Sequence, residues 1–130
     1  MSEAAKKTVN ILIYSDSATV RHDVMRSLGE TDGETAFQWT EAATATGAQE
    51  KVENGAFDLI IVDSETTKIS GLVLARTLHE ELGQVPPIIA IVARPQDEWL
   101  SEFSKVDVSV EYPLNPLKIS AAVHQALKLH

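Results

Sequence analysis

The chain has 130 residues, of which 44% are hydrophobic and 23% charged, and this is typical of one globular domain with its own apolar core. Its 11 Lys and Arg against 19 Asp and Glu give a net charge of -8, which disfavours direct nucleic-acid binding because phosphates bind to cationic side chains. Cysteine is absent, which excludes disulfides and thiol nucleophiles, and no apolar run approaches the ~20 residues of a membrane span, so we expect a cytoplasmic protein without a membrane partner.

A polar segment, residues 1–8, precedes the single predicted domain, residues 9–130. In chain order, the predicted strands of this domain are 11–14, 37–40, 59–62, 88–93 and 106–110. The first, third and fourth are continuous apolar runs rich in β-branched residues, which favours strands buried on both faces. The second and fifth alternate apolar and polar residues, which favours edge strands with one solvated face.

Helical periodicity separates these strands. Apolar residues three or four positions apart predict a helix after every strand. Ser17 is the expected N-cap of the first helix, and Gly29 lies just past its end. The fourth helix is expected to begin at Pro95 and the last at Pro116, because proline suits the first helical position.

This alternation of strands and helices predicts an α/β fold. Short connections between them require right-handed crossovers, which produce a parallel sheet with helices on both faces. If the apolar runs are central and the alternating ones lie at the edges, the strand order is 2-1-3-4-5. The expected architecture is the flavodoxin-like (βα)5 three-layer sandwich, in which ligands bind beyond the C-terminal ends of the central strands.

Acidic residues follow two of the central strands. Asp16 comes after the first strand and Asp63 directly after the third, with Glu65 two residues further on. The strand order makes these strands neighbours, and two adjacent carboxylates repel unless a cation such as Mg²⁺ separates them. We expect Asp63 to be a nucleophile towards a phosphoryl group. For Glu65 a surface-loop position is the favoured interpretation, and a metal site would need only its main-chain carbonyl. Capping of the first helix is the alternative role for Asp16.

A wider set of residues then resembles a known family. Its motifs are ILIYSD at 11–16, DLIIVD at 58–63 with Gly71 following, PIIAIVA at 87–93, and Tyr112 with Pro113 before the last helix. They resemble the CheY-like receiver domains of two-component response regulators. The similarity spans nearly the whole chain, so we expect a stand-alone receiver that is not an enzyme.

In that family, a sensor histidine kinase or phosphotransfer protein donates a phosphoryl group to an aspartate at the end of the third strand. The resemblance places this role on Asp63. It places direct Mg²⁺ coordination on Asp16, on Asp63 and on the carbonyl of Glu65. It also implies a downstream protein partner, and a partner face made by the fourth helix, fifth strand and fifth helix. Trp99 and Phe103 are candidate contacts on that face, through which a homodimer is a further expectation.

The sequence departs from the family where phosphorylation is normally supported and read out. Ser15 replaces an acidic residue, so weak Mg²⁺ binding is expected. Val92 replaces a hydroxyl residue and has no donor for a phosphoryl oxygen, while Tyr112 replaces the lysine that pairs with that group. Ser109 replaces the aromatic switch residue. Tyr112 and Arg94 are candidates for a compensating phosphate contact.

These departures leave more than one functional interpretation open. The favoured one is a receiver that is phosphorylated on Asp63 and switches atypically. The alternative is a pseudo-receiver that binds partners independently of phosphorylation. A flavodoxin-type FMN protein is less favoured, because the loop after the first strand lacks the glycine that allows close approach to phosphate. An aspartyl-phosphate phosphatase is also less favoured, because the second acid is Glu65 rather than Asp.

Overall fold

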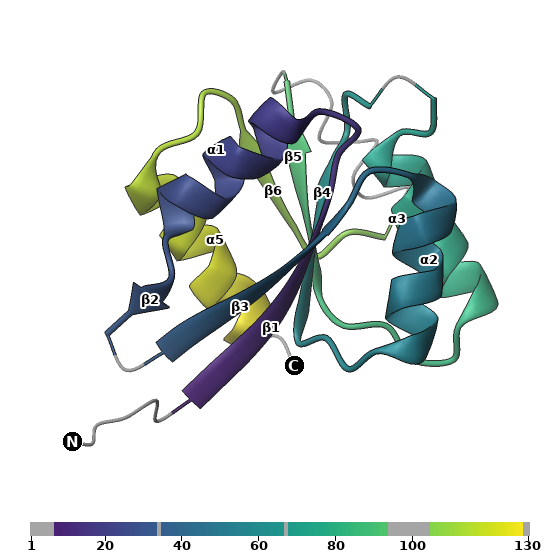
Figure 1. Cartoon of the computed structure of the whole chain (residues 1–130), viewed down its shortest axis with the longest axis horizontal. Helices are drawn as coiled ribbons and strands as arrows, with labels where there is room; N and C mark the ends of the chain where they lie inside the picture. Colours follow the sequence, from purple (N-terminus) through teal and green to yellow (C-terminus); the bar gives the residue numbers. More distant parts are fainter. Residues whose placement is uncertain (1–6, 34, 67, 94–104, 129–130) are drawn as a thin grey trace.

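A twisted sheet lies between two layers of helices (Figure 1). The computed structural model describes residues 7–33, 35–66, 68–93 and 105–128. The helices are α1 (Ala18–Leu28), α2 (Ala45–Asn54), α3 (Gly71–Glu81) and α5 (Pro116–Lys128). Figure 1 shows α1 and α5 on one face of the sheet and α2 and α3 on the other, which confirms the predicted three-layer α/β sandwich.

The sheet has the predicted parallel order and one added edge strand. Its strands are β1 (Lys7–Tyr14), β2 (Thr31–Asp32), β3 (Thr35–Ala42), β4 (Leu59–Asp63), β5 (Ile88–Val92) and β6 (Val108–Glu111). The order is β2-β3-β1-β4-β5-β6, so the five parallel strands follow the expected 2-1-3-4-5. The short β2 pairs antiparallel with β3 and was not predicted. β1 begins at Lys7, so the strand takes in the last two residues of the polar segment 1–8.

The core is divided between the two faces of the sheet, because successive strand residues point to opposite sides. Under α1 and α5, the fully buried strand residues are Ile11, Ile13, Leu59, Ile61, Ile89 and Ile91. Under α2 and α3, they are Leu12, Ile60, Val62, Ile88, Ala90 and Val92. Burial on both faces explains why the central strands are continuous apolar runs in the sequence.

The first helix confirms its predicted ends. The Ser17 hydroxyl accepts a hydrogen bond from the main-chain N–H of Val20, and Gly29 follows the helix with a φ of 86°. The helix predicted to begin at Pro95 lies outside the described residues, as do Arg94, Trp99 and Phe103. Within the described ranges, no helix is both long and apolar enough to cross a membrane.

The first residue of α3 lies directly against the end of β4. A Cβ on Gly71 would lie 2.5 Å from the main-chain oxygen of Asp63 and 2.7 Å from the Cβ of Val62. Both distances are shorter than van der Waals contact, and a main-chain oxygen cannot rotate out of the way. The absence of a side chain at Gly71 therefore allows α3 to approach the strand end that carries Asp63.

Gly71→Ala is expected to lower the free energy of unfolding by about 1–3 kcal/mol, the usual cost of an overpacked contact. Equilibrium unfolding in urea, followed by circular dichroism, measures the change. Gly83→Ala is the matched control, because a Cβ there meets no atom within 4 Å. The control should leave stability unchanged or raise it by up to about 1 kcal/mol. Equal stability of the two variants would contradict the close approach.

Candidate functional site

The register of two central strands brings Ser15 beside Asp63. Tyr14 pairs with Val62 at the ends of β1 and β4, so the residues that follow them also lie side by side. Both side chains are buried, with exposed fractions of 0% for Ser15 and 2% for Asp63. A carboxylate so far removed from water needs hydrogen-bond donors to compensate for its lost hydration.

Both oxygens of the Asp63 carboxylate accept such bonds. The Ser15 hydroxyl donates to Oδ2 at 2.8 Å, and the main-chain N–H of Glu65 donates to Oδ1 at 2.9 Å. The Ser15 hydroxyl itself accepts the N–H of Ser17 at 3.0 Å, which directs its own proton towards Asp63. Ser15 is therefore a hydrogen-bond partner of Asp63, a role that sequence analysis missed when it treated this position only as a lost charge.

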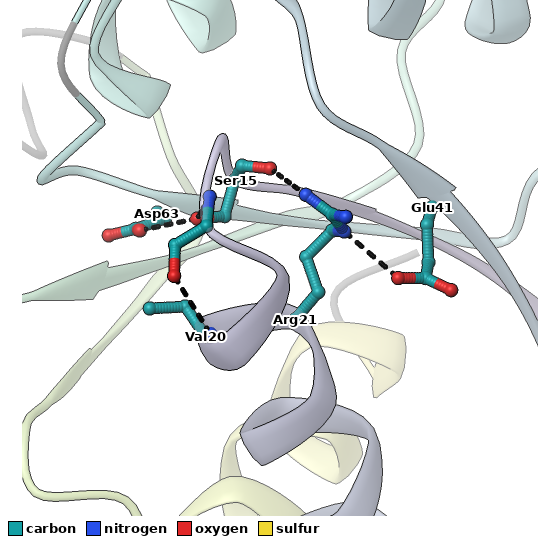
Figure 2. Close-up of polar contacts among 6 residues, drawn as sticks. Ser15, Val20, Arg21, Glu41 and Asp63 are labelled. Atoms are coloured by element: carbon teal, nitrogen blue, oxygen red, sulfur yellow. Dashed lines mark hydrogen bonds and ion pairs between the residues drawn. The ribbon is translucent and has the colours of Figure 1, made fainter.

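Arg21 holds the main chain of Ser15 from α1. Its Nη1 donates to the Ser15 carbonyl oxygen at 2.6 Å, and its Nε pairs with Oε1 of Glu41 at 2.9 Å. Figure 2 shows Ser15 between Asp63 and Arg21, and Arg21 between Ser15 and Glu41. The Arg21 side chain is 14% exposed and that of Glu41 is 41% exposed, so solvent screens this pair in part. Sequence analysis missed Arg21, although a cation near the N-terminal end of a helix is disfavoured by the helix dipole and so hints at a specific partner.

Tyr14 forms a hydrogen bond with the loop between β4 and α3. Its hydroxyl donates to the main-chain oxygen of Ile69 at 2.6 Å, and the Thr66 hydroxyl donates to the same oxygen. Burial raises the pKa of Tyr14, a hydrogen bond with Thr66 partly offsets this, and the charges of Asp16 and Asp63 raise the pKa further. The Tyr14 phenol therefore keeps its proton at neutral pH and donates it to the Ile69 oxygen.

Tyr112 is a second phenol, which follows β6 and packs against the core under α1 and α5. Burial is the main cause that raises the pKa of Tyr112 well above its ordinary value, and the charges of Asp63, Asp23 and Glu65 add to it. The hydroxyl oxygen is buried, and within the described part of the chain it has no hydrogen-bond partner. Where the family resemblance implies an ammonium group, the protein therefore has a neutral hydroxyl that no described residue pairs with.

Two other predicted positions have different surroundings. Val92 is fully buried in the cluster under α2 and α3, so its side chain is part of the core. Ser109 of β6 pairs with Ala90 of the neighbouring β5. It lines a groove of about 370 Å³ together with residues of α5. Val92 and Glu111 pair where β5 and β6 end, and Ser109 therefore lies two residues before the end of its strand.

The donor set at the strand ends consists of oxygen atoms. Asp16 is exposed beside Ser15, and Glu65 is exposed in the turn after β4. The carboxylates of Asp16 and Asp63 and the carbonyl of Glu65 suit Mg²⁺, which is often held by one or two carboxylates with water completing its shell. Among the residues that the structure describes, no group of three or more acidic or histidine side chains could hold a metal ion. A cation here would depend on two carboxylates, which is consistent with the weak binding expected from Ser15.

Known proteins are similar to this chain in sequence and in fold. No protein-family model matches the chain. The chain is 34% identical over 122 residues to an uncharacterized response regulatory protein of Mycobacterium tuberculosis, and the alignment covers 92% of each. A CheY-like receiver domain protein from Methanospirillum hungatei superposes with a TM-score of 0.78 at 23% identity, covering 94% of this chain and 95% of that one. The response regulator TrrA from Thermotoga maritima, solved in complex with Mg²⁺ and BeF, gives 0.77 at 25% identity, covering 92% and 99%. The chain therefore belongs to the CheY-like receivers of two-component response regulators.

Proposed function

We propose that Asp63 accepts a phosphoryl group in this receiver, and that Asp16, Asp63 and the main-chain carbonyl of Glu65 hold Mg²⁺ weakly. The placement of Asp63 carries the proposal: it is a buried carboxylate at the C-terminal end of a central strand, with donors orienting both oxygens. Open α/β sheets bind their ligands at this edge. When bound, Mg²⁺ supplies positive charge that offsets the charge of the incoming phosphoryl group.

In the proposed transfer, the carboxylate acts as the nucleophile. One oxygen of Asp63 attacks the phosphorus of a phosphohistidine, and a P–O bond forms while the P–N bond breaks. The leaving imidazole nitrogen keeps the electron pair and takes a proton from solvent. The Glu65 N–H orients the carboxylate during this step. The donor is a sensor histidine kinase or a phosphotransfer protein, the kinds of partner with which receivers interact.

The readout of phosphorylation is proposed to differ from that of the family. Val92 offers no hydroxyl donor, Tyr112 offers no ammonium group, and Ser109 offers no aromatic switch. Each missing hydrogen bond to a charged group is worth about 1.5–3 kcal/mol, so slower phosphotransfer or a less stable phosphorylated form is expected. A downstream protein partner would then recognise a conformational change that does not depend on the family's usual coupling between a hydroxyl residue and an aromatic residue.

The same features favour one alternative function, in which the protein binds its partner without being phosphorylated. The observations behind it are the unpaired phenol of Tyr112 and the placement of Val92 in the core. The two functions differ in one measurable respect, which is whether Asp63 gains a phosphoryl group.

Incubation with Mg²⁺ and acetyl phosphate is expected to add one phosphoryl group to the wild-type protein and none to Asp63→Asn, as measured by intact mass spectrometry. Asp58→Asn is the matched control, because Asp58 lies at the opposite end of β4, where it accepts the N–H of Asn10 at 2.9 Å. This control should gain mass as the wild type does. A gain in Asp63→Asn would contradict the assignment, and no gain in the wild type would support the alternative function.

Tyr112→Lys is expected to lengthen the lifetime of the phosphorylated form about tenfold or more, because an ammonium group supplies a charged hydrogen bond worth about 1.5–3 kcal/mol. The decay of the phosphorylated mass with time measures this lifetime. Tyr112→Phe is the control, since it keeps the ring but supplies neither a hydroxyl nor an ammonium group, and it should not lengthen the lifetime. Equal lifetimes of the Lys and Phe variants would show that position 112 does not reach the phosphoryl group.

A further inference from the structure

We propose that Ser15 is a neutral latch on the acceptor: its hydroxyl takes the place of a cation at Oδ2 of Asp63 and keeps this carboxylate ordered when no divalent ion is bound. The latch is the hydrogen bond from Ser15 Oγ to Asp63 Oδ2, 2.8 Å long. The inference deepens the proposed function and rests on it where Mg²⁺ is concerned. It makes Ser15 a positioning residue for the acceptor rather than only a position that has lost a charge.

The oxygen that the latch occupies is bonded from the end of β1, directly before Asp16. Ser15 and Asp16 are consecutive residues that follow β1, whereas the N–H of Glu65, which binds Oδ1, belongs to the turn after β4. Oδ2 is therefore the carboxylate oxygen that is bonded from the end of β1, the strand that Asp16 follows. A cation shared by Asp16 and Asp63 is attracted to this same oxygen, so the cation and the Ser15 hydroxyl compete for it.

The chemistry of position 15 decides how the site behaves without a metal. A second carboxylate there would face Asp63, whose exposed fraction is 2%, and two anions so shielded from water repel strongly unless a cation separates them. The hydroxyl of Ser15 instead donates a hydrogen bond, and bonds to ionised acceptors are the strong ones. The N–H of Ser17 donates to Ser15 Oγ at 3.0 Å, which leaves the hydroxyl proton free to point at Asp63.

Arg21 and Glu41 position the latch. Arg21 binds the carbonyl of Ser15 at 2.6 Å and is itself anchored to Glu41 at 2.9 Å, so it restrains the residue whose side chain makes the latch (Figure 2). Glu41 lies in β3, which flanks β1 on one side, while Asp63 ends β4, which flanks β1 on the other. The end of β1 is thereby tied to both of its neighbouring strands.

The metal-free latch is tested by a double-mutant cycle of Ser15→Ala and Asp63→Ala, with urea unfolding measured in EDTA. Ser15→Ala should raise the unfolding equilibrium constant about tenfold or more when Asp63 is present, and by less than about threefold once Asp63 is Ala. Ser17→Ala is the matched control: its hydroxyl caps α1 by accepting from Val20, so its effect should be equal in both backgrounds. Equal effects of Ser15→Ala in both backgrounds would overturn the latch.

Competition with the cation is tested by calorimetric titration of MgCl₂ into the metal-stripped protein. Ser15→Ala should bind Mg²⁺ about three- to tenfold more tightly than the wild type, because one competing hydrogen bond is removed. Arg21→Gln should shift affinity in the same direction, and should have no further effect once Ser15 is Ala. Arg26→Gln is the control for charge, since Arg26 is 79% exposed and pairs with Asp23 instead. Mg²⁺ affinity in Ser15→Ala equal to or below that of the wild type would overturn the competition.

Together, the two experiments separate a failure of the latch from a failure of the proposed function. Absence of Mg²⁺ binding in every variant would contradict the metal site of the proposed function, while the cycle in EDTA would still decide whether Ser15 holds Asp63. Equal Mg²⁺ binding by the wild type and Ser15→Ala would overturn the competition and leave the proposed acceptor in place.

Discussion

The pairing of Tyr14 with Val62 is the constraint on which the rest of the site depends. Because side chains alternate along a strand, a slip of one residue would exchange the two faces of β1 and separate Ser15 from Asp63. Nothing at the site itself needs to enforce the register. Isoleucine and leucine side chains along β1 and β4 are fully buried on both faces, and they fix the pairing several residues before the strands end. Packing of the core thus determines which polar atoms meet at the edge of the sheet.

A serine at position 15, where the family resemblance implies an acidic residue, changes the nature of the proposed acceptor site. Neighbouring carboxylates need a cation to coexist, whereas Ser15 and Asp63 are joined directly by a hydrogen bond. The positions that surround a phosphoryl group have not been compensated in the same way. Val92 belongs to the core, and the hydroxyl of Tyr112 has no partner in the described part of the chain. The receiver therefore combines a well-ordered carboxylate at the proposed acceptor position with side chains that differ from those proposed to read out phosphorylation in the family.

Most of the architecture was predictable from the sequence. The apolar runs at 11–14, 59–62 and 88–93 indicated central strands because both of their faces are buried, and Ser17 and Gly29 marked the ends of α1. The strand order then placed Asp16 and Asp63 at the same edge. The short β2 was missed because an antiparallel pair of two residues leaves no periodic signal.

The polar contacts of the site could not be predicted in the same way. The roles of Ser15, Arg21 and Tyr14 depend on which atoms the register and the side-chain rotamers bring within hydrogen-bond distance. In the sequence, Tyr14 reads as one more apolar strand residue and Arg21 as one more charge on a helix. Periodicity reports which face a residue occupies, but it does not report which donor a buried carboxylate finds.

A crystal structure of the protein with Mg²⁺ and beryllofluoride is the most direct test of the proposed site. It reveals which carboxylate oxygen of Asp63 binds beryllofluoride and whether the Ser15 hydroxyl stays bonded to Asp63. We expect beryllofluoride on one oxygen of Asp63, Mg²⁺ on the other, and a Ser15 hydroxyl that has released Oδ2. Density for beryllofluoride elsewhere, or an unmodified Asp63 that is still bound by Ser15 at saturating Mg²⁺ and beryllofluoride, would contradict this expectation.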